Sequence, residues 1–146
     1  MTLVIKEYKY SKSINILSTL FSNKVLAMTR LHEAINEAAE YALRSDGPFK
    51  HSCFIMSGKK IIARGNNHVR QQIGTSSVHA EIDAIWRINN TDLYDNLKAI
   101  VIRSSPTGRL GNSRPCVMCM SALKQHGIKT IVYSSVGGSI VMERIQ

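Results

Sequence analysis

The chain has 146 residues, of which 44% are hydrophobic and 20% are charged, and its formal net charge at pH 7 is +9. This length predicts a single globular domain, and no apolar run approaches the roughly 20 residues that a membrane-spanning helix needs. The cysteine count of three is odd, and the chain turns charged at Lys6 and Glu7, too early for a signal-peptide core, so we expect a cytoplasmic protein without a disulfide framework.

The positive charge favours anionic partners, and nucleotides and nucleic acid are the two classes that it suggests. The sequence contains no arginine-rich tract and no aromatic-studded RNA-binding motif, which favours a small nucleotide over a long nucleic acid. A soluble protein with a merely basic surface would have the same charge, so composition alone leaves these alternatives open.

Residues 1–27 are predicted to form a basic N-terminal extension, and residues 28–146 a single domain. The extension contains a weak apolar cluster at Ile14–Phe21, which would be partly helical or would pack on a neighbouring subunit. Within the domain, Thr29 is an acceptable N-cap for a first helix, whose apolar residues recur at helical spacing: Leu31, Ile35, Ala38 and Ala42. Ser45–Pro48 would end this helix, because glycine and proline commonly follow a helix C-terminus.

A β-hairpin is expected next. Cys53–Met56 is a short apolar strand, and Ile61–Ala63 returns after a turn of polar residues and glycine. Cys53 is expected to be a small core side chain. Gly65–Asn67 would break the second strand, and residues 68–78 would form a polar loop.

The second half of the chain alternates between helices and strands. We expect a helix from His79 to about Ile88, a strand at Ala99–Ile102, a polar loop at 103–114, a helix from Pro115 to about His126, and strands at Thr130–Tyr133 and Ile140–Met142. Ile82, Ile85 and Trp86 are expected to face inward. This order predicts a three-layer α/β/α fold with a mixed sheet of about five strands.

Three side chains of the kinds that bind zinc stand at the predicted starts of the last two helices: His79, Cys116 and Cys119. Cysteines three residues apart share one face of a helix, and a helix N-terminus favours the thiolate form. Zinc takes four tetrahedral ligands from nitrogen and sulfur, so these three would leave one position for water. An open position is typical of catalytic zinc.

A structural zinc site would instead need a fourth cysteine or histidine, but no second Cys-x-x-Cys pair is present. The other histidines considered do not pair at metal-ligand spacing: His51, His68 and His126. Glu81 follows His79 by two residues and could face the open position without binding the metal, where it would move protons. A first-turn glutamate that serves only the helix dipole is the alternative, and the neighbouring donor set favours the catalytic role.

The motifs His79-Ala80-Glu81 and Pro115-Cys116-Val117-Met118-Cys119, preceded by Gly65-Asn66-Asn67, resemble the cytidine and deoxycytidylate deaminase superfamily from about Met28 onward. The resemblance implies a cytidine-deaminase-like fold, one Zn²⁺ ion on the histidine and the two cysteines, and Glu81 as the catalytic proton shuttle. It also implies that Asn67, or the neighbouring Asn66, contacts the base or sugar, and that the backbone N–H of Ala80 holds the base carbonyl. A homodimer or higher homo-oligomer is expected.

The loop before Pro115 departs from many relatives, because it is long and carries three arginines, Arg103, Arg109 and Arg114, the last in place of an acidic residue. These cations are candidate phosphate contacts, and side chains that are merely solvated are the alternative. His51 stands where a small residue is common and would narrow the floor of the pocket.

The favoured function is zinc-dependent hydrolytic deamination of cytidine, deoxycytidine or dCMP, with dCMP preferred because of the basic loop. The first alternative is a tRNA adenosine-type or single-stranded nucleic acid deaminase with the same mechanism. The second alternative, from another class, is a non-catalytic zinc-folded binding subunit, which would have no need of Glu81.

Overall fold

The computed structural model describes residues 2–5, 23–70 and 77–146. Its elements in chain order are β1 (Thr2–Ile5), α1 (Asn23–Ala42), β2 (Lys50–Ser57), β3 (Lys60–Asn66), β4 (His68–Val69), β5 (Ser77–Val78), α2 (Ala80–Trp86), the 3-10 turn η3 (Thr91–Leu93), β6 (Leu97–Ser104), β7 (Leu110–Gly111), α3 (Val117–Gln125), β8 (Ile128–Ser134) and β9 (Ile140–Arg144). Within these ranges, no helix combines the length and the apolar character needed to cross a membrane.

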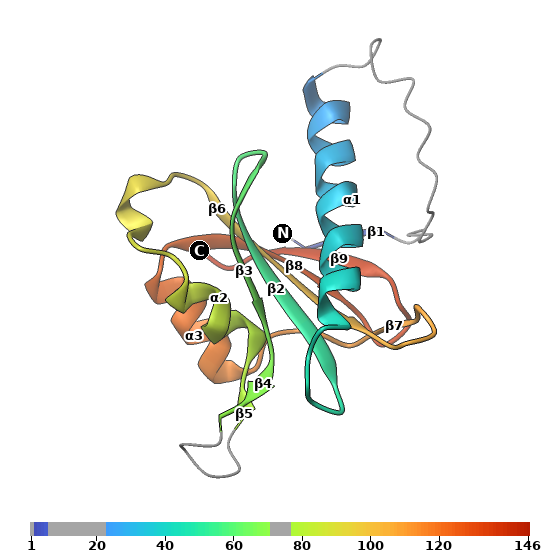
Figure 1. The fold of residues 1–146 in the computed structure, drawn as a ribbon. Coiled ribbons are helices and arrows are strands. Elements are labelled where there is room, and N and C mark those ends of the chain that lie inside the picture. Colours follow the sequence, from blue (N-terminus) through green and yellow to red (C-terminus); the bar gives the residue numbers. More distant parts are fainter. Residues whose placement is uncertain (1, 6–22, 71–76) are drawn as a thin grey trace.

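One mixed sheet runs through the molecule in the order β1-β9-β8-β6-β2-β3, and β7 pairs with β6 off this path. The β6–β8 pair is parallel, and the other pairs of this sheet are antiparallel. Figure 1 shows α1 on one face of the sheet and α2 with α3 on the other. The predicted three-layer α/β/α fold is therefore confirmed. Five of its strands are the expected ones, namely β2, β3, β6, β8 and β9, and β1 and β7 add to them.

Each face of the sheet buries its own apolar cluster, because successive side chains of a strand point to opposite faces. Phe54, Ile100 and Val132 pack under α1, and Cys53 and Val101 pack on the side of α2 and α3. Cys53 is fully buried, which confirms its expected place in the core.

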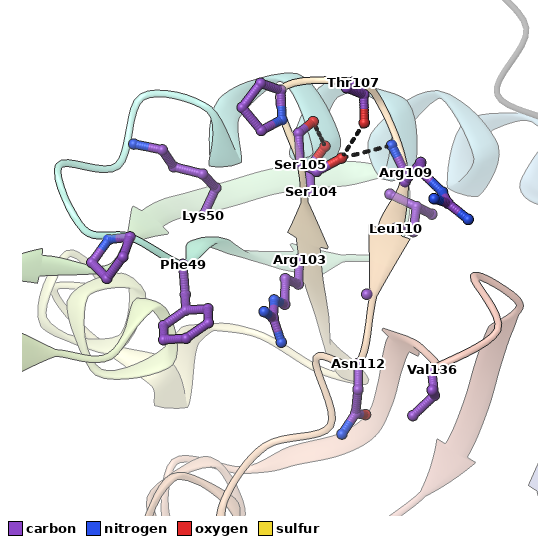
Figure 2. A pocket seen from close by; sticks show the side chains of 13 residues that line it. Phe49, Lys50, Arg103, Ser104, Ser105, Thr107, Arg109, Leu110, Asn112 and Val136 are labelled. Carbon is purple, nitrogen blue, oxygen red and sulfur yellow. Dashed lines mark hydrogen bonds between the residues drawn. The ribbon is translucent and has the colours of Figure 1, made fainter.

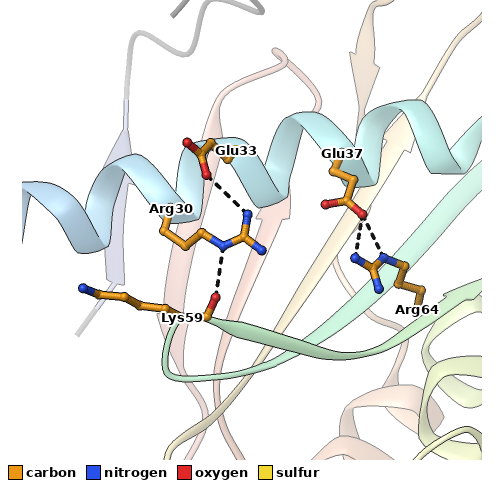
Figure 3. A network of polar contacts seen from close by, with 5 residues as sticks. All are labelled: Arg30, Glu33, Glu37, Lys59 and Arg64. Carbon is orange, nitrogen blue, oxygen red and sulfur yellow. Dashed lines mark hydrogen bonds and ion pairs between the residues drawn. The ribbon is translucent and has the colours of Figure 1, made fainter. Parts of the chain in front are cut away.

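Polar contacts also attach α1 to the β2–β3 hairpin (Figure 3). Arg30 donates from Nε to the carbonyl of Lys59 at 3.0 Å and pairs with Glu33 at 3.3 Å. Glu37 pairs with Arg64 of β3 at 2.8 Å. These side chains are a third to two-fifths exposed, so each pair contributes less than about 1 kcal/mol, and the apolar cluster holds the helix in place.

Several element boundaries differ from the sequence predictions. The first helix begins at Asn23, so Thr29 lies inside it and is not the N-cap. Good helix formers such as Leu26 and Ala27 allow the earlier start. Gly65 and Asn66 do not break the second strand, because β3 runs through both. The division at residue 28 stays a prediction, and the apolar cluster at Ile14–Phe21 lies outside the described residues.

The two predicted loops contain further strands. Residues 68–69 and 77–78 pair as β4 and β5, while 71–76 lie outside the described residues. Residues 103–104 and 110–111 pair as a short hairpin of β6 and β7. The sequence did not predict these pairings, because two-residue strands have no detectable periodicity.

On the α2–α3 face, α2 starts next to His79 as predicted, whereas the start of α3 and the end of α2 differ from the predictions. Cys116 is the N-cap of α3, so Pro115 lies before the helix and not inside it. The second helix ends at Trp86, which is 55% exposed and does not face inward. The guanidinium of Arg70 lies 4.7 Å from the centre of the Trp86 ring, so a cation–π contact replaces core burial.

The sheet topology explains why the two helices converge. β3 and β6 are both antiparallel to β2, so they run in the same direction and their carboxyl ends share one edge of the sheet. The chain leaves β3 for α2 and leaves β6 for α3, and both helices therefore start at that edge. Ligand sites in α/β folds lie at the carboxyl ends of such strands.

Candidate metal centre

His79 and Cys116 are the N-cap residues of α2 and α3, and neither side chain makes a capping hydrogen bond. Cys119 lies in the first turn of α3. The sulfur of Cys119 lies 3.3 Å from Nδ1 of His79, and the sulfur of Cys116 lies 3.7 Å from the same nitrogen. The three donor atoms all lie within 4.8 Å of one another. The structure thus brings together the three residues that the sequence predicts as metal ligands.

The donor set fits zinc both in chemistry and in spacing. Zinc binds imidazole nitrogen at about 2.0–2.1 Å and thiolate sulfur at about 2.3 Å, so a tetrahedral ion holds these two donors about 3.5 Å apart. The two sulfur–nitrogen distances, 3.3 and 3.7 Å, lie on either side of that value. Among the described residues the group contains three members, as an open zinc site requires.

The electrostatics of Cys119 differ from the sequence expectation. Burial raises the pKa of this thiol, and the negative charge of Glu81 raises it further. A metal ion that binds this thiol would replace its proton, so metal binding at the site should release protons and depend on pH.

Glu81 lies in the first turn of α2 and is 6% exposed. Burial raises the pKa of its carboxyl, while its own backbone N–H, His79 and Cys119 lower it in part. Glu81, His79 and Cys116 line one cavity of about 220 Å³. A carboxyl, a metal-binding group and space for a small ligand therefore share one site.

The three candidate substrate contacts differ in their relation to this cavity. Asn67 and Ala80 line it, whereas Asn66 is not among its lining residues. The Asn67 amide accepts a hydrogen bond from the backbone N–H of His51 at 2.9 Å and donates one to the carbonyl of Phe49 at 2.6 Å. Asn67 thus also holds the segment before β2 at the rim of the cavity. Ala80 is the first residue of α2, where backbone N–H groups have no partner within the helix.

His51 lines the same cavity, as its predicted place on the pocket floor requires. Burial lowers the pKa of this histidine, and the positive charge of Arg103 lowers it further. The neutral imidazole is therefore favoured beside the metal-binding residues.

Asp83 is a buried residue of the site that the sequence reasoning missed. Its carboxylate accepts a hydrogen bond from the backbone N–H of Asn66 at 3.1 Å and pairs with Arg87 at 3.2 Å. Asp83 is 5% exposed. It therefore ties the end of β3 to α2, and so fixes Asn67 relative to His79. An acidic residue four positions before an arginine on a helix indicates an ion pair. No local pattern indicates that the same carboxylate accepts a hydrogen bond from a strand.

A buried pair of serines, also missed, holds the segment that leads to Cys116. The hydroxyls of Ser113 and Ser134 lie 2.8 Å apart, and Ser113 also accepts from the backbone N–H of Ser134 at 2.8 Å. The hydroxyl of Ser134 donates to the carbonyl of Gly111 at 2.6 Å. Ser113 lines the 220 Å³ cavity, so this hydrogen-bond network connects β8 to the wall of that cavity.

The three candidate phosphate arginines have different surroundings. Arg114 lines the small cavity, but its guanidinium pairs with Glu143 at 3.0 Å. Arg103 and Arg109 line a second, larger cavity. The structure does not gather the three arginines into one cluster.

Comparison with known proteins agrees with this geometry. The family model "Cytidine and deoxycytidylate deaminase zinc-binding region" matches residues 27–135, about three quarters of the chain. The chain belongs to this deaminase family. A search of curated proteins finds no match to this chain.

Solved structures share the fold of this deaminase-family chain at low sequence identity. Cytidine deaminase from Burkholderia pseudomallei is 19% identical, with a TM-score of 0.55, over 78% of this chain and 92% of that one. Apo dCMP deaminase from the cyanophage S-TIM5 is 14% identical, with a TM-score of 0.52, over 80% of this chain and 86% of that one. The same phage enzyme in complex with dCMP and dUMP gives a TM-score of 0.50 at 14% identity, over 80% and 85% of the two chains.

Proposed function

We propose that this chain is a zinc-dependent hydrolytic deaminase that converts a cytosine nucleoside or nucleotide to the uracil form and ammonia. The observation that carries the proposal is the meeting of His79, Cys116 and Cys119 beside the buried carboxyl of Glu81 on one cavity. Membership of the deaminase family supports the same reaction. The dCMP and dUMP bound by the cyanophage enzyme support a pyrimidine substrate.

His79, Cys116 and Cys119 would hold the zinc ion. When bound there, zinc would lower the pKa of a coordinated water to about 7. Glu81 would accept a proton from the attacking water and pass it to the ring nitrogen beside the reacting carbon. Asn67 and the backbone N–H of Ala80 would orient the base.

The reaction forms a bond between the water oxygen and C4 of the pyrimidine and breaks the bond from C4 to the amino group. Glu81 would deliver the second proton of the water to the departing ammonia. The cytosine compound and one water molecule supply all the atoms of the uracil product and ammonia, so no further reactant is needed. Burial of Glu81 keeps bulk water from competing for these protons.

The test is ammonia release by the zinc-loaded protein from cytosine, cytidine, deoxycytidine, CMP, dCMP, guanine, adenosine and a short oligonucleotide. The proposal expects turnover of at least one cytosine nucleoside or nucleotide. Turnover of adenosine or guanine alone, or of none of the panel, would contradict it.

A second candidate is the same reaction on cytosine or adenosine within RNA or single-stranded DNA. The exposed ring of Phe49 at the cavity favours it, because exposed aromatic rings stack on unpaired bases. Polymer binding would weaken steeply with added salt through counterion release, whereas turnover of a mononucleotide would change much less. A non-catalytic zinc-folded binding subunit is disfavoured by the buried carboxyl of Glu81 beside the metal-binding residues.

We also propose that the chain forms a homo-oligomer. Val117 and Met118, at the start of α3, are 88% and 76% exposed and follow directly after Cys116. Exposed apolar side chains beside a site are typical of interaction surfaces. Sedimentation equilibrium of the zinc-loaded protein would show a dimer or larger assembly, and a monomer at micromolar concentration would contradict the proposal.

A further inference from the structure

A cleft of about 640 Å³ adjoins the small cavity and shares Phe49 with it. The segment 48–50, the β6–β7 hairpin and Val136 form its walls (Figure 2). Lys50, Arg103 and Arg109 line this cleft, and no acidic residue is among its lining residues. The hydroxyls of Ser104, Ser105 and Thr107 also line it. The composition of the walls is therefore suited to an anion.

Arg103 occupies the central position among these cations. Its guanidinium carbon lies 4.6 Å from the centre of the Phe49 ring, and Figure 2 shows it pointing toward that ring, while the charged ends of Lys50 and Arg109 point away from it to either side. Its partner in the hairpin register is Gly111. A Cβ at Gly111 would lie 3.2 Å from Cδ of Arg103, so the absence of a side chain there leaves room for the arginine.

Arg103 also keeps its charge available. The ion pairs of the described residues involve Arg30, Arg64, Arg87 and Arg114, and Arg103 is not in one. The cation–π contact orients the guanidinium without neutralising it. Arg114 differs, because Glu143 already neutralises it.

The charge of Arg103 also reaches the small cavity. Arg103 lies opposite His51 in the register of β2 and β6, and His51 lines that cavity together with Glu81 and His79. Arg103 therefore lies between the proposed site of the base and the cationic cleft. A phosphate joined to a nucleoside in the small cavity would be close to it.

We propose that Arg103, held between Phe49 and Gly111, is the centre of a phosphate subsite in this cleft and makes the chain selective for phosphorylated substrates. The inference rests on the proposed deamination of a cytosine nucleoside or nucleotide in the small cavity. Arg109 and the hydroxyl groups complete the subsite. Lys50, whose amine donates to the Ser45 carbonyl, and Arg114 are not part of it. The phosphate is that of a mononucleotide or of the next residue in an oligonucleotide.

Calorimetric titration with the reaction products tests this assignment on the zinc-loaded protein, because neither deoxyuridine nor dUMP is turned over. We expect dUMP to bind about tenfold or more tightly than deoxyuridine, since hydrogen bonds between charged groups are strong. Arg103→Gln should bring the two affinities to within about threefold, through a loss of dUMP affinity alone. Arg144→Gln, which removes an exposed arginine at the end of β9, is the matched control and should preserve the difference.

An unchanged preference for dUMP in the Arg103→Gln protein would overturn the subsite, as would equal binding of the two products by the native chain. Deoxyuridine affinity and melting temperature should be the same in native and Arg103→Gln proteins, which separates the effect from misfolding. Continued deamination of deoxycytidine would show that the proposed function stands even where the subsite fails. If the chain releases ammonia from no cytosine compound, the proposed function itself fails.

A third titration distinguishes the sources of the phosphate. A trinucleotide with a central deoxyuridine should bind more tightly than dUMP if the cleft takes a flanking phosphodiester, and no more tightly if it takes the phosphate of a mononucleotide. In both cases Arg103→Gln should weaken the binding of whichever of the two ligands binds more tightly by about tenfold. Insensitivity of both ligands to this substitution would contradict the proposal.

Discussion

Gly65 of β3 lies against Ala84 of α2 so closely that a Cβ on the glycine would come within 2.4 Å of the Ala84 nitrogen and 2.5 Å of the Ala80 carbonyl oxygen. Backbone atoms cannot move aside as a flexible side chain would. The short helix that carries Glu81 therefore depends on this glycine for its distance from the sheet.

Gly65→Ala should displace α2 and lower both stability and zinc affinity. Overpacking costs roughly 1–3 kcal/mol, and a shift of His79 would disturb the donor geometry. Thermal melting and a competitive zinc titration measure the two effects. Gly137→Ala is the matched control, because an added Cβ there meets no atom within 4 Å. Equal zinc affinity in both variants would show that the close packing does not position His79.

Glu81→Gln should keep zinc but lose turnover by about 10²- to 10⁴-fold, because the amide cannot carry a proton. Glu81→Ala should behave in the same way. Metal content by mass spectrometry and the rate of ammonia release separate the two properties. Normal turnover in either variant would remove the proposed role of this carboxyl.

Cys116→Ala should lose zinc, since two donors hold the ion much less firmly than three. The matched control is Cys53→Ala, because Cys53 is buried in the core and lies outside the donor group. The control should retain one zinc per chain. Zinc loss in the Cys53 variant alone would contradict the proposed ligand set.

Asp83→Ala should destabilise the fold by about 1–3 kcal/mol, because the Asn66 N–H would lose its partner in a partly buried place. It should also raise KM, because Asn67 would no longer be fixed. Arg87→Ala removes the other partner of Asp83, but Arg87 is 55% exposed, so it should cost less than about 1 kcal/mol. Urea unfolding compares the two variants, and equal costs would show that the bond to Asn66 contributes little.

Lys98→Met should stabilise the protein at neutral pH. Burial lowers the pKa of Lys98, which lies on β6 opposite Met56, so the folded state binds this proton less well than the unfolded state does. Stability of the native chain therefore rises with pH between the lowered pKa and the unfolded value of about 10.4. The gain in stability from Lys98→Met should be complete at pH values below the lowered pKa and should vanish at pH values above the unfolded pKa. Urea unfolding at pH 7 and pH 11 checks this, with the exposed Lys60→Met as control.

The order of elements and the meeting of His79 with the cysteine pair were predictable from the sequence. Apolar spacing marks the helices, and this local pattern can be read from one sequence. The residue types of the two motifs and their resemblance to the deaminase superfamily predicted that His79, Cys116 and Cys119 share one metal ion.

The contacts that hold the site in place were not predictable, because they join residues far apart in the chain. Nothing local indicates that Asp83 bonds Asn66, that Ser113 meets Ser134, or that Glu143 neutralises Arg114. Gly65 illustrates the same limit. The sequence suggested a strand break, whereas the residue lies within a strand and its small size serves a neighbouring helix.

The separation of His79 from Cys116 along the chain has a consequence for folding. These donors are 37 positions apart in the sequence, yet their side chains meet only when α2 and α3 are both packed on the sheet. A divalent ion shared by them is a cross-link that closes this loop and binds the unfolded chain poorly. Removal of the metal by a chelator should therefore release α2 and α3 from the sheet before it affects α1. The supply of metal would then determine the lifetime of the folded protein.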